Sequence, residues 1–312
     1  MMVTIIGFGF VGKSVYESIY KPDREYCGID VSIHDPLKGF EQDEESILAS
    51  DVIFICVPTP TIDGSQDLRI FNKVFFRLLE SEYEGLIVIK STIMPHSISQ
   101  YQNSLCSIIH SPEFLNQCEP FMPQENHIVG CNEMAMAKLS RYRNLFPSIV
   151  NMEIVDLKTA AMIKYVHNIH GALKVAFFNE IFDICEMEKI DYRTMLNGLF
   201  SVNNNVGRQY TKICADGKRG FGGACFPKDA IAFEEVYDTK TVAAAIDSNK
   251  KYSREEMKAC LAKEPWVFAY ENKDPCVETF EINDITIEED DCGNINKRKM
   301  WPYADMSGVA TP

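Results

Sequence analysis

Apolar and polar residues follow two different periods along this chain. Short continuous apolar runs, rich in Val and Ile, are typical of strands that are buried on both faces of a parallel sheet. They occur at residues 2–6, 26–34, 51–57, 86–89, 105–109 and 127–129. Stretches of helical length lie between them, including 11–19 and 133–146. This alternation predicts an α/β domain over 1–150, in which helices cover both faces of a doubly wound sheet.

The region that follows, 156–189, has the composition of one long helix, because Ala, Ile, Met and Lys are frequent and Pro is absent. Its length predicts a spine that links two lobes or two subunits. Helix gives way over 191–220 to a segment containing Asn, Gly and Lys, and helical patterning then continues to about 262. We therefore predict an all-helical central domain over 151–263. The remainder, 264–312, contains short strand-like runs and an acidic stretch typical of a solvated tail, and it predicts a short irregular acidic extension.

The first apolar run leads directly into G-F-G-F-V-G, residues 7–12. Glycines permit a tight turn and a close approach of a pyrophosphate, whose charge the N-terminus of the next helix favours. Asp35 ends the second predicted strand, 23 residues beyond Gly12. A carboxylate near this spacing bonds the adenosine ribose hydroxyls, which favours NAD over NADP. The order strand, turn, helix, strand predicts a Rossmann-like NAD-binding domain, whereas the glycine motif alone would be a weak signal.

Three further strands end in polar segments: P-T-P at 58–60, K-S-T at 90–92 and H-S-P-E-F-L at 110–115. Ligands bind at the carboxyl ends of parallel strands in such sheets, so these segments are predicted to meet at one crevice. Any one of them could be simple turn chemistry. Ser91 and His110 are individually expected to be structural.

The segment F-G-G-A-C-F-P-K-D, residues 221–229, combines two glycines with a cysteine that precedes a proline. Proline suits the first turn of a helix, so Cys225 is predicted to lie at a helix N-terminus, where the thiolate is favoured. Lys228 and Asp229 would share its helical face. The alternative interpretation is a buried cysteine beside an ordinary glycine turn.

The long predicted helix carries Lys164 and Asn168 four residues apart, hence on one face. A lysine on a largely buried helix needs a partner, because an unpaired buried ammonium is costly, although a surface lysine is the simpler alternative. His167 and His170 lie beside Asn168 and are interpreted as structural, since their spacing without a carboxylate is thin support for a metal site. No metal is expected.

Composition narrows the classes of partner. The 312 residues are 46% hydrophobic and 24% charged, which is ordinary for a globular protein of two domains. A net charge of −14 argues against non-specific binding to nucleic acid or to an anionic membrane. The 11 cysteines include no C-x-x-C pair, and neither a signal peptide nor a membrane-length apolar run is found. We therefore expect reduced thiols and a cytoplasmic location.

Six blocks, taken in order, resemble the UDP-glucose/GDP-mannose 6-dehydrogenase family: G-F-G-F-V-G, F-I-C-V-P-T-P, K-S-T, S-P-E-F-L, K-Y-V-H-N and F-G-G-A-C-F-P-K-D. They extend over roughly residues 2–249, and their combination is far more specific than any single block. The resemblance implies oxidation of a sugar C6 alcohol twice to the uronic acid, with NAD as cofactor. It favours UDP-glucose as substrate, with GDP-mannose as the alternative.

The resemblance also implies roles for individual residues. The cofactor would be bound by Gly7, Gly9, Phe10, Val11, Gly12, Asp35, Pro58, Thr59, Thr92 and Lys228. The substrate would be bound by Glu113, Phe114, Leu115, Lys164, Asn168 and Gly222. The catalytic residues would be Cys225, Lys164, Asn168, Asp229, Glu113 and Thr92. Among them Cys225 would be the nucleophile, because a four-electron oxidation that releases no aldehyde needs a covalent hold on the substrate.

The chain also departs from the family pattern. The S-P-E-F-L block continues as Asn116, Gln117 and Cys118, which lack the usual basic residue, and Ala224 replaces a common Ser. Arg208 is only a weak counterpart of the arginine that reaches a neighbouring subunit's substrate. Nothing after residue 249 resembles the family's third, nucleotide-gripping domain, so we expect a partner chain to complete binding, or a reduced affinity for the nucleotide.

Two further expectations concern assembly and class. The long helix makes a homodimer plausible. The rival to an enzyme is a non-catalytic relative that binds NAD or a nucleotide sugar without turnover, which the combined presence of Cys225, Lys164, Asn168, Glu113 and Asp229 disfavours.

Overall fold

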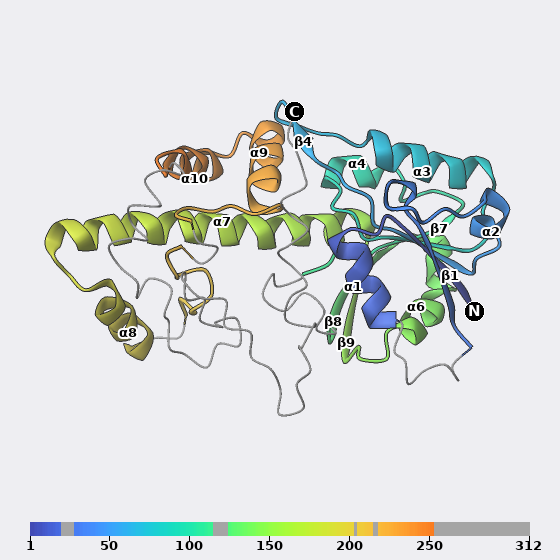
Figure 1. Ribbon diagram of the computed structural model, residues 1–312, viewed down its shortest axis with the longest axis horizontal. Helices are drawn as coiled ribbons and strands as arrows, with labels where there is room; N and C mark the ends of the chain where they lie inside the picture. Colours follow the sequence, from blue (N-terminus) through green and yellow to red (C-terminus); the bar gives the residue numbers. More distant parts are fainter. Residues whose placement is uncertain (20–27, 115–123, 203–204, 215–217, 253–312) are drawn as a thin grey trace. The chain divides into compact units, whose positions relative to one another are not determined.

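The computed structural model describes residues 1–19, 28–114, 124–202, 205–214 and 218–252. Its main sheet has seven strands in the order β2-β1-β3-β6-β7-β8-β9. They are β1 (Met2–Ile6), β2 (Asp30–His34), β3 (Val52–Ile55), β6 (Leu86–Ile89), β7 (Ser107–His110), β8 (Asn126–Cys131) and β9 (Asn151–Val155). Figure 1 shows this sheet with its covering helices. Neighbouring strands are parallel except β7 and β8, which are antiparallel. The prediction of a doubly wound α/β sheet is confirmed, whereas β9 and the reversal at β8 were not predicted.

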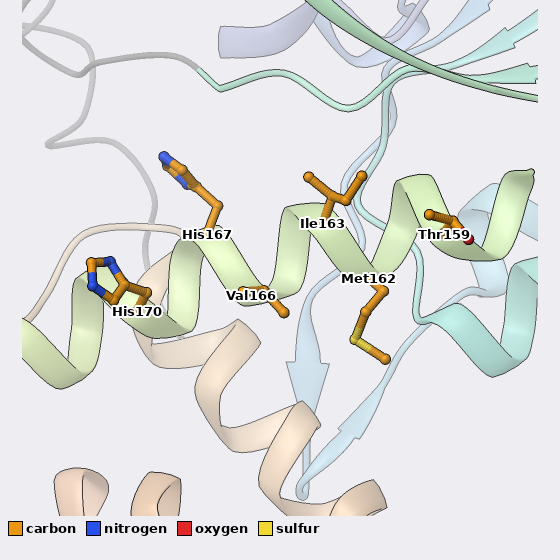
Figure 2. Close-up of a pocket in the computed structure, with 6 residues that line it drawn as sticks. All are labelled: Thr159, Met162, Ile163, Val166, His167 and His170. Carbon is orange, nitrogen blue, oxygen red and sulfur yellow. The ribbon is translucent and has the colours of Figure 1, made fainter. Parts of the chain in front are cut away.

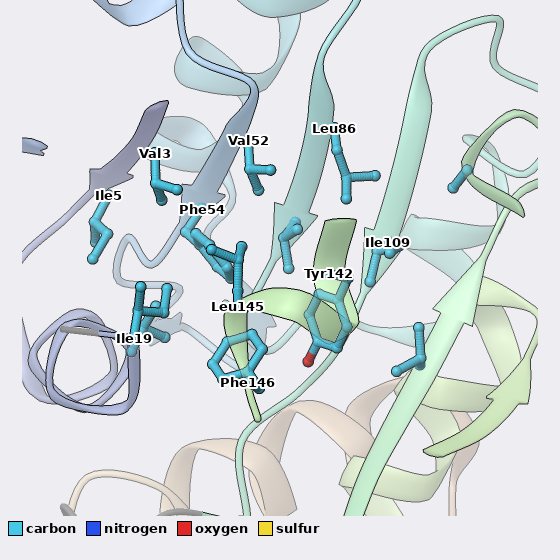
Figure 3. Packing of buried hydrophobic residues seen from close by; sticks show 14 of the residues in the cluster. Val3, Ile5, Ile19, Val52, Phe54, Leu86, Ile109, Tyr142, Leu145 and Phe146 are labelled. Carbon is cyan, nitrogen blue, oxygen red and sulfur yellow. The ribbon is translucent and has the colours of Figure 1, made fainter. Parts of the chain in front are cut away.

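Alternate residues of the central strands enter two different hydrophobic cores. Val52 and Phe54 lie in one cluster, whereas Ile53 and Ile55 lie in the other. Figure 3 shows the first cluster, where strand residues pack against Ile19, Tyr142 and other residues of the covering helices. Because both of their faces are buried, the central strands β3 and β6 are continuously apolar, which is the pattern that made them predictable.

Six helices accompany the sheet among the described residues. They are α1 (Phe10–Ile19), α2 (Glu44–Leu48), α3 (Arg69–Glu80), α4 (Pro95–Ser99), α5 (Glu133–Met136) and α6 (Leu139–Leu145). A 3₁₀ turn, η2 (Pro36–Lys38), and a hairpin of β4 (Thr61–Ile62) and β5 (Ser65–Gln66) complete this part of the described chain.

The prediction of one helix over 133–146 was wrong, because α5 and α6 are separate. Lys138 lies at the break and donates to the main-chain carbonyls of Glu84 and Gly85. This tertiary contact has no signature in local periodicity, which explains why the pattern suggested one helix.

The long helix α7 (Leu157–Glu188) is confirmed. Its N-terminus is capped by Asp156, whose carboxylate accepts from the Thr159 amide at 2.9 Å, and it ends at Lys189 in the left-handed conformation. Leu157 and Ala161 of α7 belong to a hydrophobic core of the sheet. Residues farther along α7 pack against α9 (Phe226–Tyr237) and α10 (Lys240–Lys250), as Figure 1 shows.

The expectation that helix gives way over 191–220 was wrong for its first part, where α8 (Tyr192–Val202) forms. Tertiary contacts stabilise this helix: the Tyr192 hydroxyl donates to the Thr211 carbonyl at 2.7 Å, and its ring packs against Phe182. The predicted helical run beyond Asp229 is divided by Asp238, which has a φ of 46°. The predictions for 253–312 lie outside the described residues.

No described helix combines the length and the apolar character needed to cross a bilayer.

Candidate functional site

The glycine turn between β1 and α1 is shaped by close backbone contacts. Gly7 has a φ of +89°, and a Cβ there would lie 2.7 Å from the Cys56 carbonyl oxygen. A Cβ on Gly12 would lie 2.0 Å from the Gly7 carbonyl oxygen. A Cβ on Gly9 would meet no atom within 4 Å, so open space lies over this position. This is the arrangement that a dinucleotide fits, since the backbone at Gly9 can be approached from outside.

Asp35, predicted to bind the ribose, lies against the same turn. Its Oδ2 accepts a hydrogen bond from the Phe8 amide at 2.8 Å, and the Lys38 amine donates to the Phe8 carbonyl at 3.1 Å. Phe10 and Val11 form the first turn of α1 beyond it. Asp35 therefore lies against the glycine turn, which its carboxylate stabilises.

At the ends of β3 and β6 the predicted cofactor residues Thr59 and Thr92 are in contact. The Thr59 hydroxyl donates to the Thr92 carbonyl at 2.8 Å. Gln66 of the hairpin donates to the same carbonyl at 2.9 Å, and it also contacts the Tyr165 hydroxyl of α7 at 3.2 Å. Sequence reasoning missed Gln66, because an isolated glutamine in a short hairpin carries no signal. The neighbouring Pro58 is exposed.

Ser91 is expected to be structural, and its contact agrees with that role. Its hydroxyl is buried and donates to the Val57 carbonyl at 2.7 Å. His110 at the end of β7 is completely buried, and this burial lowers its pKa to about 4. At neutral pH its imidazole is therefore uncharged.

Glu113, which follows β7, is bound by two lysines. Lys90, at the end of β6, lies with its Nζ 2.6 Å from the Glu113 Oε1, and both side chains are buried. Lys164 of α7 donates from its Nζ to the main-chain carbonyl of Glu113, also at 2.6 Å. The Lys164 ammonium lies 5.2 Å from the Phe114 ring centroid, and that ring packs edge-on against His167. Leu115 lies outside the described residues.

The electrostatics of the two lysines differ. Burial is the main influence on Lys164 and lowers its pKa, an effect that the nearby Cys225 and Asp229 partly offset. Burial also acts to lower the pKa of Lys90, but the Glu113 carboxylate and the Tyr142 hydroxyl outweigh it and raise the pKa. Lys90 is thus held as an ammonium, whereas Lys164 loses its proton more readily than an exposed lysine.

Cys225 is exposed and occupies the N-cap of α9, with Pro227 in the first turn as the sequence predicted. Asp229, one turn later, is buried and accepts from Asn168 of α7 at 2.6 Å through Oδ2. Its Oδ1 lies 2.5 Å from the Lys228 Nζ. The main-chain carbonyl of Lys228 in turn accepts from Thr61 of the β4–β5 hairpin at 2.8 Å. The start of α9 is therefore attached both to α7 and to the NAD-binding side of the chain.

The glycine segment before Cys225 is held by two asparagines. The Asn179 side-chain oxygen of α7 accepts from the Gly220 amide at 3.1 Å, and Asn249 of α10 exchanges two hydrogen bonds with the main chain of Phe221. Gly222 itself is exposed. Neither asparagine was singled out from the sequence, because a lone asparagine far from the segment that it holds has no local pattern.

The predicted residues thus fall into two connected sets. The glycine turn and Asp35 form one. The second set is linked by the contacts described above and by helices α7 and α9, and it lies next to Cys225 in the sequence. Its members are Glu113, Lys164, Asn168, Asp229 and Lys228. Arg208 lies with its guanidinium 4.6 Å from the Phe200 ring centroid. Within the described part of the chain, no cluster of His, Cys, Asp and Glu side chains suits a metal ion.

His167 and His170 are among the residues that line a pocket along α7, and Figure 2 draws these lining residues as sticks. Its remaining lining residues are Thr159, Met162, Ile163 and Val166.

The chain combines a doubly wound sheet that carries a dinucleotide-binding turn with a helical unit, and one long helix joins the two. The helical unit presents a cysteine at a helix N-terminus. These features together define a class of two-domain dinucleotide-binding proteins. The chain belongs to the UDP-glucose/GDP-mannose dehydrogenase family. Residues 34–149 match the family's NAD binding domain, and residues 158–252 match its central domain. The resemblance drawn from the six sequence blocks is confirmed.

Similar proteins include the UDP-glucose 6-dehydrogenase of Rickettsia bellii (strain RML369-C), 31% identical over 236 residues, which cover 70% of this chain and 53% of that protein. UDP-glucose 6-dehydrogenase TuaD of Bacillus subtilis (strain 168) is 30% identical over 255 residues, covering 75% and 53%. The chain therefore spans about half the length of the curated relatives it matches.

Solved structures agree on the fold. A UDP-glucose dehydrogenase from Pyrobaculum islandicum superposes with a TM-score of 0.63 at 22% identity, covering 80% of this chain and 68% of that one. The GDP-mannose dehydrogenase of Pseudomonas aeruginosa gives a TM-score of 0.54 at 19% identity, covering 85% and 72%.

Proposed function

We propose that this chain catalyses the NAD-dependent oxidation of the C6 alcohol of a nucleotide sugar to the carboxylate, with UDP-glucose as the substrate. The observation that carries the proposal is the hydrogen bond from Asn168 of α7 to Asp229, in the first turn of the helix that Cys225 caps, with Lys164 one helical turn before Asn168 and bonded to Glu113. Family membership supports the same reaction class.

The nicotinamide of NAD, when bound, supplies the hydride acceptor. The NAD molecule would be bound by Gly7, Gly9, Gly12, Asp35, Phe10, Val11, Pro58, Thr59, Thr92 and Lys228. The open space over Gly9 fits a pyrophosphate, as does the N-terminus of α1 that follows. This part of the proposal is independent of which sugar is oxidised.

The protein's own chemistry centres on Cys225. Oxidation of the alcohol removes one hydride and one proton and leaves an aldehyde. The Cys225 thiolate adds to the aldehyde carbon, which forms a C–S bond and an oxyanion that Lys164 and Asn168 would stabilise. Loss of a second hydride from this carbon gives a thioester. Water then attacks the thioester, the C–S bond breaks, and the thiolate and the uronate are released.

Asp229 and Glu113 would take the protons and orient the attacking water. Both lie in buried positions at the two ends of the cluster, Asp229 bonded to Asn168 and Glu113 to Lys164. Glu113, Phe114 and Gly222, together with Leu115, would contact the sugar nucleotide.

The test is mass spectrometry of the products that form from UDP-glucose and NAD. We expect UDP-glucuronate and two NADH per sugar. Cys225→Ser should abolish uronate formation and leave NAD binding intact, because the hydroxyl is a poor nucleophile without a base to activate it. Full activity in Cys225→Ser would refute the covalent role. GDP-mannose is the alternative substrate, and turnover of neither sugar with NAD bound would favour a non-catalytic relative.

The homodimer is also a proposal. Val166, Phe177 and Ile184 of α7 are exposed and apolar, and their spacing of 11 and 7 residues places them on one face of the helix. A second copy packed on this face would bury them. Sedimentation of the chain and of Phe177→Glu tests the idea, with Val150→Glu, an exposed apolar position outside α7, as the control. A monomeric parent chain would contradict it.

A cytoplasmic location completes the proposal. It rests on the spacing of the cysteines, which includes no C-x-x-C pair and does not suggest a disulfide framework. Disulfide mapping of the protein isolated from its own cells under thiol-blocking conditions tests it, since extensive disulfide formation would contradict a reducing compartment.

A further inference from the structure

Lys90 has no part in the reaction described above, although it lies in the same K-S-T segment as Thr92. Its side chain is 1% exposed. The Nζ lies 2.6 Å from the Glu113 Oε1, 3.3 Å from the Ser111 Oγ and 3.4 Å from the Tyr142 hydroxyl. Three N–H groups thus meet three oxygen acceptors, which is what a buried ammonium requires.

The polar groups behind Lys90 allow one arrangement of protons. The Gln124 carbonyl can only accept, so the His127 Nε2 at 3.2 Å carries the proton and its Nδ1 accepts from the Tyr142 hydroxyl at 2.7 Å. Ser111 must then donate to the Tyr142 oxygen at 2.7 Å. Burial lowers the pKa of His127 to about 4, in agreement with a neutral imidazole. In this arrangement both Ser111 and Tyr142 accept from Lys90, so the network fixes it as a cation.

Lys90 and Lys164 bind different groups of Glu113. Lys90 contacts the carboxylate, and Lys164 contacts the main-chain carbonyl of the same residue. A hydrogen bond from an ammonium to a carboxylate also gains the attraction between two opposite charges, which a neutral carbonyl does not provide. Lys164 stays on the carbonyl because Lys90 already neutralises the carboxylate.

We propose that Lys90 is a positioning residue of this site: it occupies the Glu113 carboxylate and so keeps the Lys164 ammonium at the Glu113 carbonyl. Lys164 lies one helical turn before Asn168, which is bonded to Asp229 in the first turn of the helix that Cys225 caps. This inference rests on the proposed function. The Glu113 side chain is 9% exposed. If Lys90 were removed, the Glu113 carboxylate would be a buried negative charge that no longer contacts a positively charged group. Lys164 is the ammonium bonded to the same residue, and the carboxylate would draw it away from Cys225.

The test measures the Cys225 thiol, so it needs neither NAD nor a sugar. Wild type, Lys90→Met and Lys90→Met/Glu113→Gln are treated with iodoacetamide at neutral pH, and the alkylation rate of the Cys225 peptide is followed by mass spectrometry. A nearby cation raises the thiolate fraction. We expect Lys90→Met to slow alkylation by about three- to tenfold, and the double variant to restore it, because the glutamine no longer competes for Lys164.

Lys138→Met is the matched control, since it removes a half-buried lysine that donates to carbonyls beside β6. It should leave the rate unchanged. Lys90→Arg keeps the charge and should remain close to wild type. If Lys90→Met fails to fold, Lys90→Gln, which retains a polar donor toward Ser111 and Tyr142, is measured with the same expectation.

Wild-type rates in folded Lys90→Met, or a slow rate that Glu113→Gln does not restore, would overturn the proposal. In a parallel assay, Lys90→Met should form NADH more slowly than wild type with an unchanged KM for NAD, and Lys138→Met should match wild type. If wild type makes no uronate, the proposed function fails, whereas the alkylation result still decides the role of Lys90.

Discussion

The three glycines of the turn after β1 have different physical reasons for being glycine. Gly7 and Gly12 are enclosed by the protein's own backbone, so a side chain at either would meet a carbonyl oxygen that cannot move independently. Gly9 faces open space. At the residue scale, glycine is therefore required by the fold at positions 7 and 12, whereas at position 9 it leaves room for a ligand.

Gly12→Ala and Gly9→Ala should separate these two requirements. A Cβ 2.0 Å from the Gly7 oxygen forces the turn apart, so Gly12→Ala should lower the free energy of unfolding by roughly 1–3 kcal/mol and also weaken NAD binding. Gly9→Ala should leave the melting temperature nearly unchanged and weaken NAD binding at least tenfold. Thermal melting and calorimetric titration with NAD measure the two effects. Full NAD affinity in Gly9→Ala would place the cofactor elsewhere.

Site residues that belong to a local sequence motif could be predicted, whereas those that depend on contacts distant in sequence could not. Cys225, Lys164 and Asn168 stand in segments whose spacing has a chemical meaning, so they were found, and their catalytic roles stay predictions. In the sequence, Lys90 stands out only as part of K-S-T, and Gln66 has no recognisable pattern around it. The importance of these two lies in partners distant in sequence, such as Glu113 and Thr92. No local pattern encodes such contacts.

At the scale of elements, α7 determines how the parts of the site meet. It begins in a hydrophobic core of the sheet, contributes Lys164 and Asn168, and then carries Asn179 to the glycine segment. A composition rich in Ala, Ile, Met and Lys and free of Pro made α7 predictable to within one residue of each end. The helix α8 and the strand β9 depend on packing and on pairing with other elements, and they were missed.

Glycines in α7 and α8 provide a matched pair of substitutions. A Cβ on buried Gly171 would lie 2.5 Å from the Phe226 ring, directly beside Cys225, whereas one on exposed Gly198 would meet nothing within 4 Å. Gly198→Ala should therefore raise the free energy of unfolding by roughly 0.5–1 kcal/mol through helix propensity alone. Gly171→Ala should displace Phe226 and reduce NADH formation more than tenfold.

Thermal melting and steady-state rates distinguish the two variants. Gly198→Ala is the control for activity, because it lies outside both sets of site residues. Unchanged turnover in folded Gly171→Ala would show that the position of Phe226, and so the packing of α7 against the start of α9, is irrelevant to the thiol.

At the scale of the whole molecule, two buried histidines couple folding to pH. His110 and His127 lie inside the sheet domain, and burial lowers the pKa of each to about 4 from an ordinary 6.5. The unfolded chain binds these protons near pH 6.5, whereas the folded chain does not bind them until about pH 4. Their contribution to stability is therefore complete above pH 6.5 and is lost as the pH falls toward 4.

Each histidine should account for a loss on the order of 3 kcal/mol in the free energy of unfolding between pH 6.5 and 4. Denaturant unfolding at several pH values measures the slope. His127→Gln cannot take up the proton, so its slope in this window should be clearly shallower than that of the wild type, whatever its stability at neutral pH. His170→Gln, which replaces an exposed imidazole on α7, should leave the slope unchanged. An equal slope in His127→Gln and wild type would mean that the Tyr142 network tolerates a charged imidazole, and the proton arrangement assigned around Lys90 would then be wrong.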